Sequence, residues 1–117
     1  MRNFREYDIW IDSMKLVKEV YLLVKLFPST EKFSLTSQIT RSAVSVPSNI
    51  AEGASRRSEK DFARFLEISL GSIFELETQL IIAKNCGYID ENQMNDSVNK
   101  CMSLQKRMYS LIKKIRG

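Results

Sequence analysis

The chain has 117 residues, which suffice for one domain with a single hydrophobic core and are too few for two. Hydrophobic residues make up 44% and charged residues 27%, a balance that excludes a disordered chain, and no apolar run reaches the roughly 18 to 20 residues of a membrane span. The net charge of +4 is modest, and the absence of histidine removes the commonest general base and the commonest metal ligand.

The first predicted helix runs from about Asp8, its expected N-cap, to Phe27. Pro28 then ends it, because a proline disfavours the helical conformation of the residue before it. Apolar residues recur in this segment at steps of four and three, as on one face of a helix: Trp10, Met14, Val17, Tyr21 and Val24. We expect this stripe to face the core.

The second segment, about Leu35 to Ala54, is harder to assign, because Thr, Ser and Val are weak helix formers and Pro47 lies inside it. The same steps of four and three nevertheless continue through Ile39, Ala43, Val46, Ile50 and Gly53. We therefore predict a helix that is kinked at Pro47. Small side chains should let a neighbouring helix approach it closely: Ser42, Ala43, Ser45, Ala51 and Gly53.

The third predicted helix, about Asp61 to Cys86, has a capping-box-like start at Ser58 and a glycine, Gly87, where a helix C-terminus favours a positive φ. Its stripe comprises Phe62, Leu66, Ser69, Ile73, Leu76, Leu80 and Ala83. Further apolar residues lie off this stripe: Phe65, Ile68, Phe74, Ile81 and Ile82. A bundle buries only one face of each helix, so this excess predicts self-association.

The fourth predicted helix runs from about Asp90, with Gln93 three residues later, to Arg116. Its stripe comprises Met94, Ser97, Cys101, Leu104, Met108, Leu111 and Ile115. The connections between the four segments are short, so consecutive helices should be antiparallel. We therefore predict an all-α protein, with residues 1–117 forming one antiparallel up-down four-helix bundle.

Several polar residues lie within or beside the apolar stripes, where a bundle could build an active site: Arg41, Asn49, Glu52, Glu75 and Glu77. We interpret them as structural, because buried charges must be paired, and expect Arg41 to pair with Glu75 or Glu52. Glu75 and Glu77 are two residues apart on a helix and point in different directions, which disfavours a site of paired carboxylates. Carboxylate metal sites in bundles also use histidine, which this chain lacks, so a metal site is disfavoured as well.

The two cysteines, Cys86 and Cys101, lack the close Cys/His pairs of zinc sites, so we expect two buried thiols. The sequence therefore predicts no catalytic residue, no metal and no cofactor.

The N-terminal residues 1–6 carry charges and no apolar segment typical of a signal peptide, so we expect a cytoplasmic protein without a membrane partner.

Basic residues concentrate in two places that together form a candidate nucleic-acid-binding surface. The first surrounds the start of the third helix, where backbone donors also favour anions, although a solvated, capped loop has the same pattern: Arg56, Arg57, Lys60 and Arg64. The second lies on the fourth helix, without any acid after residue 99: Lys100, Lys106, Arg107, Lys113, Lys114 and Arg116. The other 12 basic and 14 acidic residues leave −2 on the rest of the chain.

The stretch QITRSAVSVPSNIAEG at residues 38–53 resembles the signature of bacterial four-helix-bundle proteins encoded in intervening sequences of 23S rRNA genes, the S23-like family. Further similarities cover essentially the whole chain: Phe27-Pro28, Glu31, Phe62, Phe65-Leu66, Gly71-Ser72, Glu75 to Leu80, and Gly87-Tyr88-Ile89. The resemblance implies a ring-like homopentamer. It also implies similarity to the accessory variability protein of diversity-generating retroelements, which binds nucleic acid together with a reverse transcriptase.

The leading hypothesis for function is a non-enzymatic, homo-oligomeric adaptor that binds RNA or DNA through its basic surface. The alternative is a homo-oligomeric scaffold that binds a protein, such as a reverse transcriptase, with the lysines serving solubility. A helical enzyme that cleaves RNA or transfers nucleotides is disfavoured, because the helical nucleases we would compare use a histidine.

Overall fold

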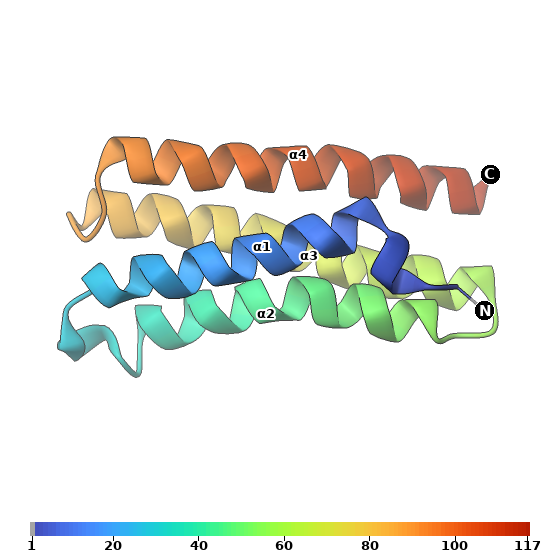
Figure 1. Ribbon diagram of the computed structural model, residues 1–117, viewed down its shortest axis with the longest axis horizontal. Helices are drawn as coiled ribbons and strands as arrows, with labels where there is room; N and C mark the ends of the chain where they lie inside the picture. The colour runs from blue at the N-terminus through green and yellow to red at the C-terminus, as the bar shows by residue number, and fades with distance from the viewer. Residues whose placement is uncertain (1) are drawn as a thin grey trace.

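The computed structural model describes residues 2–117, and within them it has four α-helices and no strand: α1 Asp8–Leu23, α2 Leu35–Ala54, α3 Glu59–Asn85 and α4 Glu91–Arg116. Each helix packs on the next in sequence, and α1 also packs on α4. Figure 1 shows the resulting elongated bundle, with extents of 43 × 23 × 19 Å. The predicted all-α four-helix bundle is confirmed. No helix in the described part of the chain is both long and apolar enough to span a membrane.

The helix ends follow the predicted signals in α3 and α4. The Ser58 hydroxyl accepts a hydrogen bond from the Asp61 backbone N–H at 3.1 Å, as an N-cap of α3. Asp90 and Gln93 form a complete capping box at the start of α4. Gly87, just past the end of α3, has a φ of +80°, which a glycine adopts without strain.

The predicted start of α1 at Asp8 is confirmed, but the expected N-cap is wrong by one residue and the expected end by four. Tyr7 is the N-cap, so Asp8 is the first helical residue, and α1 ends at Leu23. A 3₁₀ turn, Val24–Leu26, follows, so the α-helix ends before the chain reaches Pro28. Two further 3₁₀ turns occur, Phe4–Glu6 and Ser29–Glu31.

The core of the bundle comprises the predicted stripes of α2 and α3, whose members are all buried. In α4, Ser97, Cys101, Leu104 and Met108 are buried as predicted, but Ile112 occupies the core in place of the half-buried Leu111 and Ile115. Burial raises the pKa of the Cys101 thiol to about 12. Cys86 is exposed at the end of α3, so the expectation of two buried thiols is wrong for this residue.

The predicted core stripe of α1 is wrong. The buried residues are Ile9, Ser13, Leu16 and Val20, whereas Met14 and Tyr21 are exposed and the remaining members of the predicted stripe are only half-buried. The helix has two apolar stripes about 100° apart, and the buried one includes a serine whose hydroxyl donates to the Trp10 carbonyl at 2.9 Å. The predicted stripe lies instead on the side toward α2, near the surface.

The contact between α2 and α3 depends on small side chains, as predicted. A Cβ atom added to Gly53 would lie 2.7 Å from the Phe65 Cβ, so only glycine allows this approach. Nearby, the Ser69 hydroxyl donates to the Val46 carbonyl at 2.8 Å. Helix α2 continues through Pro47, which is buried, and the kink at this proline stays a prediction.

The off-stripe apolar residues of α3 divide into two groups. Ile68, Phe74, Ile81 and Ile82 are exposed on its outer side, as predicted. Phe65 is buried against Gly53 instead of contributing to the outer surface, so for this residue the expectation is wrong.

The connections at one end of the bundle are joined by Glu31. Its carboxylate accepts hydrogen bonds from the backbone N–H of Leu35 and from the Tyr88 hydroxyl, both at 3.2 Å. The Tyr88 ring also packs on Phe27, with ring centroids 5.5 Å apart. These contacts link the α1–α2 connection to the α3–α4 connection. They give structural roles to three residues of the sequence resemblance.

We predict that Gly53→Ala lowers the free energy of unfolding by about 1 to 3 kcal/mol, because overpacking at Phe65 outweighs the better helix propensity of alanine. Urea denaturation followed by circular dichroism measures this change. The control is Ser110→Ala on the exposed side of α4, which should change stability by less than about 0.5 kcal/mol. Equal stability of the two variants would contradict the close contact.

Candidate nucleic-acid interface

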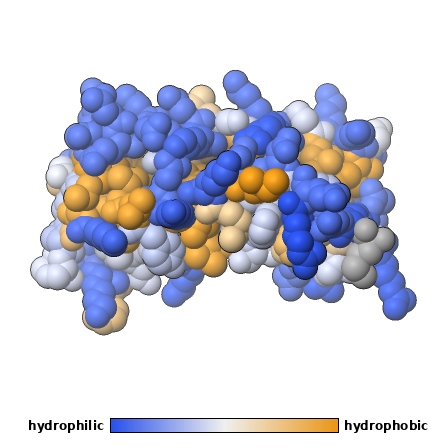
Figure 2. Space-filling view, viewed as in Figure 1, coloured by the Kyte–Doolittle hydropathy of each residue, from blue (hydrophilic) through white to orange (hydrophobic). Residues whose placement is uncertain are grey.

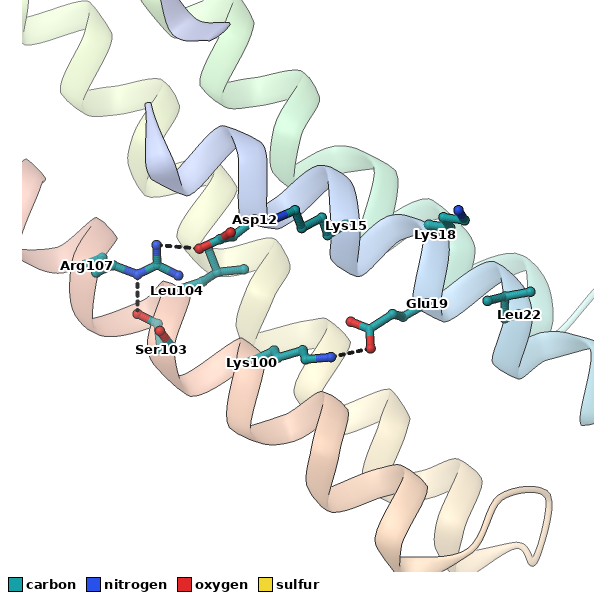
Figure 3. A pocket seen from close by; sticks show the side chains of 9 residues that line it. All are labelled: Asp12, Lys15, Lys18, Glu19, Leu22, Lys100, Ser103, Leu104 and Arg107. Atoms are coloured by element: carbon teal, nitrogen blue, oxygen red, sulfur yellow. Dashed lines mark hydrogen bonds and ion pairs between the residues drawn. The ribbon is translucent and has the colours of Figure 1, made fainter. Parts of the chain in front are cut away.

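Two of the six basic side chains of α4 are directed toward α1 and are paired there. Arg107 donates to the Asp12 carboxylate at 2.7 Å, and Lys100 is paired with Glu19 (Figure 3). Lys100 also lies 3.3 Å from the carboxylate of Asp96 on its own helix. The hydrogen bond with Glu19 is the main cause of the raised pKa of Lys100. These two cations therefore connect α4 to α1.

A third basic residue of α4, Arg116, is paired with α3. Its two terminal nitrogens donate to the two oxygens of Glu67 at 2.7 and 2.6 Å, in the bidentate geometry that suits a guanidinium and a carboxylate. This hydrogen bonding lowers the pKa of Glu67 and raises that of Arg116. The pair links the last turn of α4 to the first half of α3.

The predicted basic stripe of α4 is therefore not uniformly available to a ligand. Helix α4 itself has no acid after residue 99, but α1 and α3 supply the partners of half its cations. Lys106, Lys113 and Lys114 are exposed and have no ion pair among residues 2–117. Tyr109, 61% exposed, lies between Lys106 and Lys113 at helical steps of three and four, so an aromatic ring accompanies these lysines.

The second group of basic residues surrounds the α2–α3 connection, where a surface depression of about 490 Å³ is lined by Arg2, Ser55, Arg56, Arg57 and Glu59. Arg2, which the sequence analysis did not select, donates to the Arg56 carbonyl at 2.6 Å and is paired with Glu59. It anchors the N-terminal segment on this connection.

The arginines of this group also pack on an aromatic ring. The guanidinium groups of Arg56 and Arg64 lie 4.7 and 5.0 Å from the centroid of the Phe65 ring. Each also has an acidic neighbour on its own helix or next to it, Glu52 at 3.6 Å from Arg56 and Asp61 at 3.9 Å from Arg64. These pairs are solvent-exposed and therefore weak.

Arg57 and Lys60 are exposed and, within the described chain, have no ion pair. The start of α3 beside them already carries Glu59 and Asp61 in its first turn and the Ser58 cap, so its backbone donors are a poor anion site by themselves. The charge of the two side chains is what remains available to a ligand.

The two groups of basic residues meet at one end of the bundle. Figure 1 shows the C-terminus of α4 and the α2–α3 connection at the same end, and the Arg116–Glu67 pair joins α4 to α3 there. We name the four exposed side chains without an ion pair at this end, Arg57, Lys60, Lys113 and Lys114, the basic end. Lys106 lies further along α4.

The polar residues that we interpreted as interhelical pairs are arranged differently. Arg41 is exposed and pairs with neither Glu75 nor Glu52, so this prediction is wrong. Eleven residues along one helix correspond to about 16 Å, too far for Arg41 to reach Glu52. Arg41 also lies about 200° around α2 from the buried Ile39, outside the core.

The remaining members of that set make local contacts. Asn49 donates to the Ser45 carbonyl and hydroxyl, both at 2.9 Å. Glu77 accepts a hydrogen bond from the Gln105 side chain at 2.6 Å, between α3 and α4. Glu75 is exposed. Across residues 2–117, no three acidic, cysteine or histidine side chains converge as metal ligands.

A groove of about 590 Å³ between α1 and α4 was not anticipated from the sequence. Leu22 and Leu104 contribute apolar surface, and Lys15 and Lys18 stand at its α1 wall (Figure 3). The Asp12–Arg107 and Glu19–Lys100 pairs also line it, so most of its charge is already neutralised.

Comparison with known proteins places the chain in a family. The family model for 23S rRNA-intervening sequence proteins matches residues 5–110, from the first 3₁₀ turn to most of α4. The chain belongs to the 23S rRNA-intervening sequence protein family.

A crystal structure supports this assignment. A protein of unknown function from the S23 ribosomal protein family of Bacteroides thetaiotaomicron shares 27% identity and a TM-score of 0.83 with this chain, over 90% of this chain and 98% of that one. No curated protein matches. The family predicted from residues 38–53 is thus confirmed, and the descriptions of these relatives assign no biochemical activity.

The ion-pair partners in this 23S rRNA-intervening sequence protein were not selected from the sequence. Asp12, Glu19 and Glu67 lie on the sides of α1 and α3 that face α4. The sequence did contain a sign of these pairs. In an antiparallel bundle α1 and α3 both lie beside α4, and acids at the edges of their apolar stripes can therefore pair with the basic residues at the edges of the α4 stripe. Finding them requires the rotation of each helix about its axis, and that rotation was wrong for α1.

We predict a pH-dependent contribution of the Glu67–Arg116 pair to stability. Because the folded state lowers the Glu67 pKa, the contribution is present above the ordinary glutamate pKa of 4.5 and is lost as the pH falls through the lower, folded value. At pH 7 the free energy of unfolding of wild type should exceed that of Glu67→Gln by less than about 1 kcal/mol, since the pair is half-exposed. In strong acid the two proteins should be equally stable.

Thermal unfolding between pH 7 and pH 2 measures this difference. The control is Glu6→Gln, at an exposed carboxylate without an ion pair among the described residues, which should show no comparable pH-dependent gap. A difference in stability between wild type and Glu67→Gln that persists unchanged into strong acid would contradict the pairing.

Proposed function

We propose that this protein is a non-enzymatic, homo-oligomeric adaptor that binds RNA or DNA through its basic end. The observation that carries the proposal is the contrast among its cations: Lys100, Arg107 and Arg116 are paired within the bundle, whereas the four side chains of the basic end are exposed and unpaired within the described chain. Unpaired cations gathered at one place neutralise phosphates and release counterions, which favours binding that depends little on base sequence.

The outer side of α4 supports the same function. Lys106 and Lys113 flank the exposed Tyr109 ring, and a combination of cations with an aromatic ring suits a single-stranded segment whose bases can stack. The number of cations in one copy is small, so a single copy would bind weakly.

Self-assembly would convert this weak contact into useful affinity. Several copies on one nucleic-acid strand raise the effective concentration of each further basic end. Ile68, Phe74, Ile81 and Ile82 leave α3 with exposed apolar surface that an oligomer would bury. The proposed assembly is the ring-like homopentamer implied by the sequence resemblance, acting in the cytoplasm.

The second candidate function is a homo-oligomeric scaffold that binds a protein, such as a reverse transcriptase. The α1–α4 groove favours it, because a groove of about 590 Å³ with Leu22 and Leu104 in its lining suits an inserted side chain of a partner. This surface is distinct from the basic end, so the two functions can be separated by variants.

We predict that the triple variant Lys60→Glu, Lys113→Glu and Lys114→Glu loses at least tenfold in affinity for labelled single-stranded RNA and DNA. Fluorescence anisotropy across a salt series measures this, and wild-type affinity should fall steeply with salt because binding neutralises phosphates. The labelled RNA should remain intact throughout. Wild-type binding that is absent at low salt would contradict the proposal and favour the protein scaffold.

A matched control makes the same change in net charge elsewhere. Lys15, Lys25 and Lys32 are likewise exposed and without an ion pair within residues 2–117. Lys15 lies in the middle of α1, and Lys25 and Lys32 lie in the α1–α2 connection, which Figure 1 shows at the opposite end of the bundle from the α2–α3 connection. Their replacement by glutamate should change affinity by less than threefold beyond the general charge effect. Equal losses in the two triple variants would refute the assignment of binding to the basic end.

A further inference from the structure

An apolar groove between α1 and α2 contains the second apolar stripe of α1. Its volume is about 350 Å³, and its walls are formed mainly by Trp10, Met14 and Val17 from α1 and by Val44 and Pro47 from α2. We name it the α1–α2 groove. Met14 and Val44 are 45% and 39% exposed, because α2 contributes short side chains here that do not cover α1.

Figure 2 shows apolar patches interrupting the hydrophilic surface along α1 and its neighbours. Scattered apolar side chains are ordinary on a protein surface, but a groove with a tryptophan and a methionine in its wall is a typical contact site. The described chain supplies nothing that fills it.

A complementary surface lies on the outer side of α3. We name Ile68, Gly71, Phe74 and Ile82 the α3 ridge, with Phe74 being 54% exposed. Gly71 lies in the middle of this helix, and a Cβ added there would have nothing within 4 Å. A mid-helix glycine costs about 1 kcal/mol relative to alanine, and no contact within the chain requires it.

Gly71 becomes understandable if another backbone approaches the ridge. Glycine permits closer contact between two main chains than any other residue, and the large apolar side chains beside it would then pack on both sides of the contact. This is the same device that the chain uses at Gly53, where the neighbour is α3 of the same copy.

The charges of the two surfaces are opposite. From residue 65 to residue 83 the chain carries acids and no basic residue, and Glu75 on the ridge side is exposed without an ion pair in the described chain. From residue 35 to residue 51 the one charged residue is Arg41, which is exposed and equally unpaired.

We propose that the α3 ridge of one copy docks into the α1–α2 groove of the next copy, with Gly71 at the closest approach and Glu75 facing Arg41. The inference deepens the proposed homo-oligomer by naming its contact surfaces. Because ridge and groove are different surfaces of one chain, the contact is head-to-tail. Such a contact leaves a free ridge and a free groove at the ends of every open assembly and is satisfied throughout only in a closed ring.

The α1–α4 groove is a poorer receptor for the ridge. It is larger, but six of its nine lining residues are charged, so an apolar ridge docked there would remove water from two ion pairs and from Lys15 and Lys18, which are unpaired within the described chain. The α1–α2 groove has no such internal pairs. Its complementarity to the ridge therefore favours a second copy as its occupant.

The test uses one variant of each surface. Gly71→Arg places a long charged side chain on the ridge at a position with open space, so the fold of the single chain should be retained. Val44→Lys fills the apolar groove with a long side chain whose charge would have to be buried on docking. Each variant alone should fall to the 13.6 kDa mass of one chain in sedimentation velocity, with helicity unchanged by circular dichroism. Ser110→Arg on the outer side of α4 should assemble as wild type.

Mixing the two variants then distinguishes a head-to-tail contact from a symmetric one. The intact groove of Gly71→Arg should accept the intact ridge of Val44→Lys, giving a dimer of one copy of each and nothing larger. A mixture that stays monomeric, or assembly that survives in either single variant, overturns the proposed docking while leaving the homo-oligomer intact. A wild-type chain that is itself monomeric overturns both.

Discussion

The close approach of α2 and α3 at Gly53 determines how the rest of the bundle is arranged. At this point the Phe65 Cβ occupies the space that any larger residue would need, and the Ser69 hydroxyl bonds to the α2 backbone nearby. The approach requires short side chains along α2. The same composition provides little apolar cover on the other side of this helix, where α1 presents Trp10 and Met14. Tight packing within the bundle and an open groove on its surface therefore have one cause.

The charged residues divide in a comparable way between structure and surface. Arg107 and Arg116 are held by acids of two different helices, which positions α4 but leaves these cations neutralised. Four of the cations selected from the sequence, Arg57, Lys60, Lys113 and Lys114, remain unpaired within the described chain and lie near the end of α4 and beside the start of α3. Their arrangement gives each copy one localised patch, so any strong binding of an extended anion depends on several copies.

Much of the fold could be predicted from periodicity, because in α2 and α3 one apolar stripe dominates and both stripes are buried as expected. The segment around Pro47 was assigned as helix from this pattern against its poor helix propensity, and α2 is helical there. Periodicity failed in α1 because two stripes are present and the more apolar one lies at the surface. The buried stripe is hard to recognise in the sequence, because one of its core positions is a serine, Ser13, whose hydroxyl is satisfied by the Trp10 carbonyl.

The candidate site was less predictable, for a physical reason. A charge run on one helix shows where cations are, but whether they are available depends on acids of neighbouring helices. Glu67 and Asp12 become partners of α4 only when the rotation of each helix is known. The opposite error occurred for Arg41, which was expected to pair and is exposed. Surface assignments from single helices are therefore the least reliable part of such a prediction.

The most direct test of the central claim, that this chain acts as an assembly of copies, is the mass of the unmodified protein in solution. Sedimentation equilibrium at several micromolar concentrations gives this mass without assuming a shape. We predict one dominant species at five times 13.6 kDa that persists on dilution. A single species of 13.6 kDa at every concentration would contradict it, because the apolar surfaces of α1 and α3 would then have no second copy to cover them.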